Sequence, residues 1–317
     1  CRKRTLKLKI SDERENMNTD KISENMPTIG FGTYLIPNEE AQKTINTALK
    51  IGYRHIDTAE VYRNEVGIGL GLKDTFTQLS LQRDEVFITS KVFPGNPSWG
   101  REPKNYKMCI EACDSSLERL NLDYLDCYLI HAPFCKDLRL EQWKALCDLK
   151  KEGKTRTIGV SNYSQLHIQE IINEGLEVPE YNQIELHPWC QKEELVSFLK
   201  EKNIQVVAYS SLVPLEGWRA KPNQDSAKSQ SMKEDGADNS SPFKRMAKKY
   251  GVSEAQILLK WGLQMGFVIL PKSSDENRIR ENFDLSFQID DSDMKEISTM
   301  DKGDGIAWPN GDPCNSE

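Results

Sequence analysis

Residues 53–65, YRHIDTAEVYRNE, begin like a buried strand and end in ionisable side chains. Gly52 is followed by Tyr53 and Ile56, a short apolar and aromatic run that is typical of a core strand. Asp57 comes directly after this run, and Tyr62 lies in the loop beyond it. An acid at the end of a core strand needs a physical reason, which the rest of the chain supplies.

Eight runs of this kind alternate along the chain with segments whose apolar residues repeat at helical spacing. The runs predict strands at residues 28–34, 53–58, 86–92, 125–132, 156–162, 181–186, 204–210 and 267–273. Helices are predicted between them at residues 39–52, 105–121, 141–153, 164–175, 192–203 and 253–266. The repeat predicts an α/β fold, the (β/α)8 or TIM barrel, with helices outside a closed parallel sheet and long loops at its C-terminal face.

The predicted barrel is a single domain at residues 26–310 of the 317-residue chain. We expect an N-terminal arm or hairpin at 1–25, a mobile loop at 213–242 that offers little apolar surface to bury, and a C-terminal tail at 311–317. Residues 65–71, EVGIGLG, do not follow a strand directly, so we interpret them as a helix weakened by glycine and not as a dinucleotide-binding loop.

Composition argues against several classes of protein. The formal net charge of −7 disfavours a nucleic-acid-binding or polybasic membrane protein, because both need clustered positive charge. The 8 cysteines form no CxxC pair, and Cys109 and Cys113, one helical turn apart, have no third ligand nearby in the sequence, so we expect no metal. We expect a cytoplasmic monomer with reduced thiols, and a small molecule as its partner.

Polar side chains end most of the predicted strands. They are Asp57, Lys91, His131, Ser161, Asn162, Gln183, Tyr209 and Lys272. Each alone has a structural explanation, since Asp57 could cap a helix, His131 could be a core histidine and Lys91 could extend its ammonium to solvent. In a barrel, however, all strands end at the same mouth, and that mouth is where active sites lie. Together these residues predict a catalytic site.

The motifs on these strands identify a family resemblance. GFGTY, HIDTAEVYRNE, ITSKV, LIH, IGVSN, YNQIELHP, VVAYS and PKS followed by RIREN occur in this order between about Met26 and Trp308. The sequence thereby resembles the aldo-keto reductase family over nearly its whole length. The resemblance implies NADPH-dependent reduction of an aldehyde or ketone to an alcohol, with the catalytic residues Asp57, Tyr62, Lys91 and His131.

The chemistry of these four side chains agrees with the implied roles. A phenol titrates near ~10, and a neighbouring ammonium favours the phenolate, so we expect Lys91 to lower the pKa of Tyr62, the proton donor. Asp57 would hold the Lys91 ammonium in place by a charged hydrogen bond, which explains why the strand ends in an acid. His131 would donate a hydrogen bond to the substrate carbonyl oxygen and orient it.

The resemblance also implies a cofactor site. Ser161, Asn162 and Gln183 would hydrogen-bond the nicotinamide carboxamide, and Tyr209 would stack on its ring. The implied cofactor-binding residues are Gly32, Thr33, Tyr34, Asp57, Ser161, Asn162, Gln183, Tyr209, Ser210, Ser211, Leu212, Lys272, Ser273, Arg278, Glu281 and Asn282. Lys272 and Arg278 would bind the adenosine 2′-phosphate, which favours NADPH over NADH, whereas Asp275 nearby would weaken that preference.

The chain departs from the family pattern in the loops. Ala132 stands where a tryptophan is common after the histidine strand, and Ser211 stands where a proline is common. The expected substrate-binding residues are Tyr34, Tyr62, Phe93, Trp99, His131 and Trp218, with Phe134 and Trp308 as further candidates for the pocket wall. The aromatic residues could equally pack the loops. The sequence leaves open sugar aldehydes, keto sugar acids, lipid aldehydes and ketosteroids as substrates.

One alternative belongs to a different class of function. Barrels of this family can bind cofactor as regulatory or structural proteins without turnover, and the fold does not decide between the two. The complete set of four catalytic residues favours the enzyme.

Overall fold

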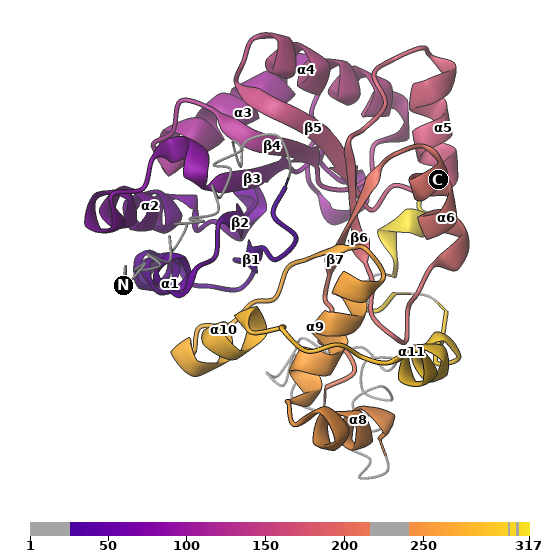
Figure 1. Ribbon diagram of the computed structural model, residues 1–317. Helices are drawn as coiled ribbons and strands as arrows, with labels where there is room; N and C mark the ends of the chain where they lie inside the picture. The colour runs from indigo at the N-terminus through magenta and orange to yellow at the C-terminus, as the bar shows by residue number, and fades with distance from the viewer. Residues whose placement is uncertain (1–25, 216–240, 304, 309–310) are drawn as a thin grey trace, which may run out of the picture.

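Eight parallel strands form one sheet that closes into a barrel (Figure 1). The computed structural model describes residues 26–215, 241–303, 305–308 and 311–317. The strands lie side by side in chain order, β1 to β8, and an isolated parallel bridge between Ile29 and Ile269 joins the two ends of the sheet. Their bounds are β1 Phe31–Gly32, β2 His55–Asp57, β3 Phe87–Val92, β4 Leu125–Ile130, β5 Thr155–Ser161, β6 Tyr181–Glu185, β7 Gln205–Tyr209 and β8 Val268–Ile269. The predicted (β/α)8 barrel is confirmed.

Helices surround the strands (Figure 1). The α-helices are α1 Asn38–Ile51, α2 Glu65–Leu79, α3 Tyr106–Leu120, α4 Arg139–Lys151, α5 Gln165–Asn173, α6 Glu193–Glu201, α8 Pro242–Tyr250, α9 Glu254–Gln264, α10 Glu276–Phe283 and α11 Asp291–Ser298. Short 3-10 helices are η2 Glu60–Tyr62, η3 Arg83–Glu85, η4 Pro97–Trp99, η5 Lys136–Leu138 and η6 Pro313–Asn315. Sequence periodicity predicted most of the helices around the barrel but not α8, α10 and α11.

Side chains alternate between two apolar layers along each strand. Ile88 and Val92 of β3 belong to the large cluster that the sheet shares with the helices, whereas Phe87 belongs to a smaller cluster made without helical residues. Because strand side chains alternate, the smaller cluster is the barrel interior, and Lys91 points the same way as Phe87. Register then aligns the strand ends, with Gly32 beside Asp57 and, further round the barrel, Ser161 beside Gln183.

The glycines of residues 65–71 serve helix packing. These residues form the start of α2, as the sequence predicted. A Cβ atom on Gly67 would lie 2.1 Å from the Asn38 carbonyl oxygen, and one on Gly69 would lie 2.6 Å from the Leu120 carbonyl oxygen. Glycine therefore lets α2 approach its neighbours closely, at some cost in helix propensity.

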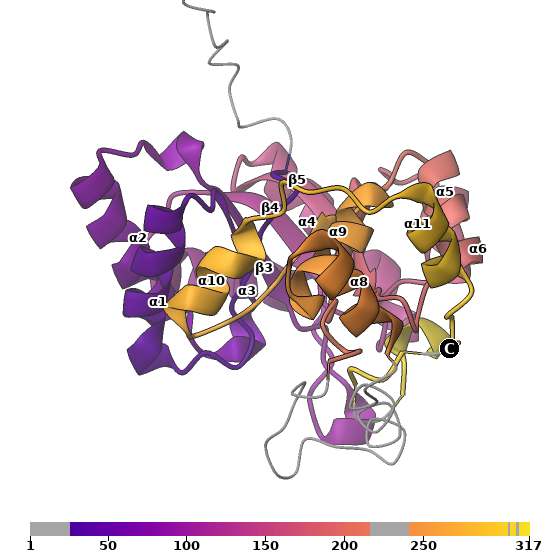
Figure 2. The same cartoon turned by 60° about the horizontal axis from the view of Figure 1, so that its bottom comes forward.

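Helices after β7 gather at one side of the barrel (Figure 2). Lys249 of α8 donates hydrogen bonds to Asp290 at 2.5 Å and to Asp293 at 2.8 Å, which ties α8 to α11. The predicted arm at 1–25 and residues 216–240 of the predicted loop lie outside the described residues. At the two edges of that loop, Val213 and Ser241 are buried, and α8 begins at Pro242.

The predicted tail packs onto the barrel, with the C-terminus beside α5 and α6 (Figure 1). Cys314 is buried within η6, and Arg139 of α4 donates a hydrogen bond to the Glu317 carbonyl oxygen at 2.7 Å. His167 of α5 contacts the Ser316 carbonyl oxygen at 2.9 Å. None of the helices in the described ranges is long and apolar enough to cross a membrane.

Candidate active site

A buried ion pair lies at the centre of the barrel mouth. The Lys91 ammonium donates to Asp57 Oδ1 at 2.6 Å and to the Thr58 carbonyl oxygen at 2.8 Å. The Lys91 side chain is fully buried, and burial lowers its pKa while the Asp57 charge opposes that shift. Gln183 donates to the other carboxylate oxygen, Oδ2, at 2.8 Å. The acid that ends β2 therefore has one partner on the neighbouring strand β3 and one on β6, across the barrel.

Tyr62 reaches the pair from η2. Its hydroxyl lies 3.5 Å from the Lys91 ammonium, and its ring centroid lies 5.1 Å from that ammonium and 5.1 Å from the Tyr34 ring. The Glu60 carboxylate holds this turn against the end of β3, because it accepts the Phe93 N–H at 2.7 Å. The structure thus brings the predicted acid to the predicted lysine.

The predicted direction of the Tyr62 pKa is wrong. Burial raises the pKa of Tyr62 well above its ordinary value, and the Asp57 charge acts in the same direction. Lys91 does not reverse this shift, because burial dominates and the Lys91 ammonium lies closer to the opposing Asp57 charge, at 2.6 Å, than to the phenol, at 3.5 Å. Tyr62 is accordingly a protonated phenol, the form that can donate a proton.

His131 meets the Tyr62 ring edge to face. It follows β4, where its backbone N–H donates to the Val92 carbonyl oxygen at 2.9 Å, and its ring centroid is 5.6 Å from that of Tyr62. Burial, with a smaller contribution from Lys91, lowers the pKa of His131 well below its ordinary value, so the imidazole is neutral. In the described part of the chain Nδ1 of His131 has no hydrogen-bond partner. An unpaired buried nitrogen in the mouth is suited to a ligand.

A second group of predicted residues forms a polar shelf along β5, β6 and β7. Asn162 donates to the His131 carbonyl oxygen at 2.9 Å and to Ser161 Oγ at 3.0 Å, and it accepts the Tyr209 hydroxyl proton at 2.7 Å. Ser161 donates to the Gln183 carbonyl oxygen at 2.8 Å. The backbone of Asn162 has φ of 64°, a left-handed conformation that asparagine tolerates. These four side chains lie together as the sequence predicted.

A third group surrounds the start of α10. Arg278 Nε donates to Ser273 Oγ at 3.2 Å, and Lys272 adjoins Ser273 in the chain. Asp275 is the N-cap of this helix, since its carboxylate accepts the Arg278 backbone N–H at 3.0 Å. The acid that was expected to weaken a phosphate site therefore has a structural role.

The other residues predicted to bind the cofactor differ in the contacts that they make. The Thr33 hydroxyl donates to the Asp57 carbonyl oxygen at 2.9 Å, so it orients β2. Ser210 adopts φ of 57° in the turn after β7, in which the Val213 N–H donates back to its carbonyl. The Glu281 carboxylate accepts the hydroxyl proton of Ser253 at the start of α9. The remaining predicted residues lie at the end of a strand, in the segment that follows it, or on α10: Gly32, Tyr34, Ser211, Leu212 and Asn282.

Aromatic rings form one wall of the mouth. Trp99 stacks on Phe93 with centroids 6.3 Å apart and on Trp308 at 5.9 Å, and Phe134 meets Trp99 edge-on at 5.0 Å. Trp308 is also 5.9 Å from the His131 ring. These rings supply an aromatic wall although Ala132 does not. Trp218, the sixth residue predicted to bind substrate, lies outside the described residues.

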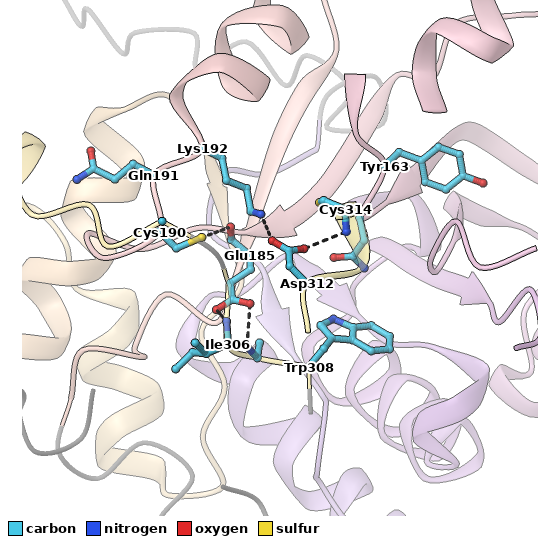
Figure 3. Close-up of polar contacts among 12 residues, drawn as sticks. Tyr163, Glu185, Cys190, Gln191, Lys192, Ile306, Trp308, Asp312 and Cys314 are labelled. Carbon is cyan, nitrogen blue, oxygen red and sulfur yellow. Dashed lines mark hydrogen bonds and ion pairs between the residues drawn. The ribbon is translucent and has the colours of Figure 1, made fainter. Parts of the chain in front are cut away.

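Sequence reasoning missed Glu185, at the end of β6. Its carboxylate accepts the backbone N–H groups of Ile306 and Ala307, both at 2.8 Å, and lies 3.1 Å from His187 Nε2 (Figure 3). Gly305 permits this approach, because a Cβ atom there would lie 2.4 Å from Glu185 Oε2. The only sequence signal was an acid in YNQIELHP, since its partners are backbone groups far along the chain.

A sequence model described as "Aldo/keto reductase family" matches residues 28–302. The chain belongs to the aldo/keto reductase family. Glyoxal reductase of Bacillus subtilis (strain 168) is 38% identical over 289 residues, which cover 90% of this chain and 93% of that protein. Methylglyoxal reductase DkgA of Escherichia coli (strain K12) is 38% identical over 280 residues, which cover 88% of this chain and 90% of that protein.

A solved structure extends the comparison to a complex. The crystal structure of a Bombyx mori aldo-keto reductase in complex with NADP is similar with a TM-score of 0.75 and 29% sequence identity. The match covers 87% of this chain and 90% of that chain.

The residues at the mouth of this aldo/keto reductase are chemically suited to a nicotinamide adenine dinucleotide. The polar shelf could hold an amide group, since the Asn162 and Gln183 amide oxygens each have two lone pairs and Gln183 Nε2 has a second N–H besides the one donated to Asp57. The basic residues Lys272 and Arg278 beside the start of α10 could hold a phosphate, which the helix N-terminus also favours. The unpaired Nδ1 of His131 shows that the mouth itself does not satisfy all of its polar groups.

Proposed function

We propose that this protein is an NADPH-dependent reductase that converts a small aldehyde or ketone to an alcohol, with Tyr62 as the proton donor. One observation carries the proposal: the Tyr62 phenol, the Lys91–Asp57 pair and the neutral His131 imidazole converge on one mouth. NADPH, when bound, would supply a hydride to the carbonyl carbon. The protein side chains would orient the carbonyl group and supply the proton.

The four residues divide the work. The Tyr62 O–H would donate its proton to the oxygen that becomes the alcohol, and Lys91 would stabilise the phenolate left behind. Asp57 would keep Lys91 charged and fixed between Oδ1 and the Thr58 carbonyl oxygen. His131, being neutral, can donate a hydrogen bond to the substrate oxygen without competing as an acid.

The phosphate preference would come from the start of α10. Arg278 carries a guanidinium that can form a paired hydrogen bond with phosphate oxygens, and Lys272 adds a second positive charge. Asp275 caps the same helix and adds one negative charge there, which the two positive side chains outnumber. We therefore propose NADPH as the preferred cofactor.

A 2-oxoaldehyde of the size of glyoxal or methylglyoxal is the substrate class that we propose. Both relatives described above are named for such compounds and span nearly the whole chain. The stacked rings of Trp99 and Trp308 occupy one side of the mouth, which favours a short carbonyl compound over a bulky one. A cytoplasmic location and a monomeric state remain predictions.

Tyr62→Phe tests the proposal. The variant keeps the ring contacts to Tyr34 and His131 but loses the proton, so NADPH consumption with methylglyoxal should fall by about 10²-fold or more. The dissociation constant for NADP⁺, measured by calorimetry, should stay near that of the wild type. Activity close to wild type would remove Tyr62 as the acid. NADP⁺ binding without turnover by the wild type on a panel of aldehydes would instead favour the cofactor-binding protein without activity.

A further inference from the structure

A chain of hydrogen bonds connects the polar shelf to the segment after α11. Trp308 Nε1 donates to the Tyr209 hydroxyl at 2.9 Å, and that hydroxyl donates to Asn162 Oδ1 at 2.7 Å. Asn162 in turn donates to the His131 carbonyl oxygen at 2.9 Å. Burial raises the pKa of Tyr209 well above its ordinary value, with Glu185 acting in the same direction, so the phenol keeps the proton that this chain requires.

The segment that carries Trp308 is fastened to the barrel on both sides of it. We call residues 305–308 and 311–317 the strap. Before Trp308, Glu185 holds the backbone N–H groups of Ile306 and Ala307; beyond it, Asp312 pairs with Lys192 at the start of α6 (Figure 3). Although burial favours the neutral acid, the Lys192 ammonium holds the pKa of Asp312 below its ordinary value.

These fastenings leave Trp308 little freedom. Its indole lies among the Trp99, Phe134 and His131 rings, while Glu185 fixes the backbone directly before it. Hydrogen bonds at the tyrosine hydroxyl fix the position of the far end of the ring and so restrict the first side-chain torsion. Because a phenol O–H prefers to lie in the ring plane, a donor and an acceptor in fixed directions also favour one orientation of the ring face. The Tyr209 ring is thus held by a donor on one side, Trp308, and an acceptor on the other, Asn162.

We propose that Trp308 is a positioning residue for the cofactor: through the Tyr209 hydroxyl, the strap holds the Tyr209 ring in the orientation that receives the nicotinamide. This rests on the proposed NADPH-dependent function and on the role that the family resemblance implies for Tyr209, which is to stack on the nicotinamide ring. A surface that is ordered before its ligand arrives loses less conformational entropy on binding. The strap thereby contributes to cofactor affinity as well as to the wall of the mouth.

Trp308→Phe isolates the hydrogen bond from the ring. Phenylalanine keeps an aromatic ring between Trp99 and Phe134 but removes the indole N–H. Loss of one such bond should weaken NADP⁺ binding about fivefold by calorimetry. The KM for NADPH should rise by a similar factor. Trp99→Phe is the matched control, since its ring is in the same cluster but hydrogen-bonds neither Tyr209 nor Asn162 among the described residues, and it should leave NADP⁺ affinity unchanged.

A double-mutant cycle with Tyr209→Phe separates a positioning role of Trp308 from a general destabilisation of the barrel mouth. The Tyr209→Phe ring can still stack but cannot receive the Trp308 hydrogen bond, so adding Trp308→Phe to it should weaken NADP⁺ binding no further. Effects that add in full would assign Trp308 a purely structural role and overturn the proposal. Unchanged or tighter NADP⁺ binding by Trp308→Phe alone would also overturn it.

The two proposals fail separately. If the wild type reduces aldehydes with NADPH while Trp308→Phe binds NADP⁺ like wild type, only the positioning role falls. If the wild type binds NADP⁺ in a Trp308-dependent way but reduces no carbonyl compound, the positioning role stands and the proposed reaction falls. A wild type that does not bind NADP⁺ would overturn both.

Discussion

Replacing the acid at the end of β2 should expose the electrostatic cost of a buried lysine. Asp57→Asn keeps the shape of the side chain but removes the only charge that touches the fully buried Lys91 ammonium among the described residues. Breaking such a pair costs about 3–5 kcal/mol when the remaining ion stays charged. The variant avoids the cost of a buried unpaired charge if Lys91 loses its proton.

Deprotonation of Lys91 makes the loss of unfolding free energy in Asp57→Asn depend on pH. Deprotonating a lysine whose unfolded pKa is near 10.4 costs about 5 kcal/mol at about pH 7 but only about 2 kcal/mol at about pH 9. The free energy of unfolding should therefore fall by about 3–5 kcal/mol at the lower pH and by no more than about 2 kcal/mol at the higher one. The sign follows from linkage: the unfolded chain binds the lysine proton and the folded variant does not, so stability rises with pH.

Urea titration followed by circular dichroism at both pH values measures the difference. Asp126→Asn is the matched control, because the Asp126 carboxylate of β4 is buried but faces Arg83 and Arg156, which are partly exposed. Arginine does not lose its proton in this range, so the control should show the same loss at both pH values. A loss in Asp57→Asn that does not change with pH would show that Lys91 stays charged, and would refute this account of the ion pair.

Three further outcomes test other parts of the mouth. Arg278→Ala should weaken NADPH binding about tenfold and NADH binding little, because only NADPH carries the extra phosphate; equal weakening of both would place the phosphate elsewhere. Trp99→Ala should change the ratio of kcat/KM between small and bulky aldehydes about tenfold at nearly constant melting temperature, whereas a uniform loss with a lower melting temperature would mean that Trp99 only packs the loop. Gly305→Ala should lower the free energy of unfolding by about 1–3 kcal/mol in urea, because its Cβ atom would lie 2.4 Å from Glu185 Oε2; wild-type stability would show that the strap does not depend on this close approach.

The sequence predicted what depends on local pattern. Short apolar runs alternating with helical segments determined the barrel, and the rule that parallel strands end at one mouth brought Asp57, Lys91 and His131 together. The pKa of Tyr62 was predicted in the wrong direction because burial of the phenol raises it most and the Asp57 charge adds to this, and no sequence pattern encodes how deeply the phenol is buried.

Contacts of the strap were beyond prediction for a different reason. Trp308 could be proposed as a wall residue from its aromatic side chain, but its hydrogen bond to Tyr209 joins two segments that are distant in the chain. Glu185 binds backbone N–H groups, which every residue except proline possesses, so nothing in the sequence marked Ile306 and Ala307 as its partners.

The joint between the first and last strands has a consequence for how the barrel assembles. β1 and β8 contain only two residues each, and the Ile29–Ile269 bridge connects residues 240 positions apart in the chain. Until β8 exists, β1 and β7 are open strand edges, and contacts between such distant residues form slowly. We expect this seam to close last during folding and to show the fastest amide hydrogen exchange among the strands. Gly32 and Lys272 lie beside this seam. A dinucleotide bound across these residues would therefore stabilise the pairing of the first and last strands.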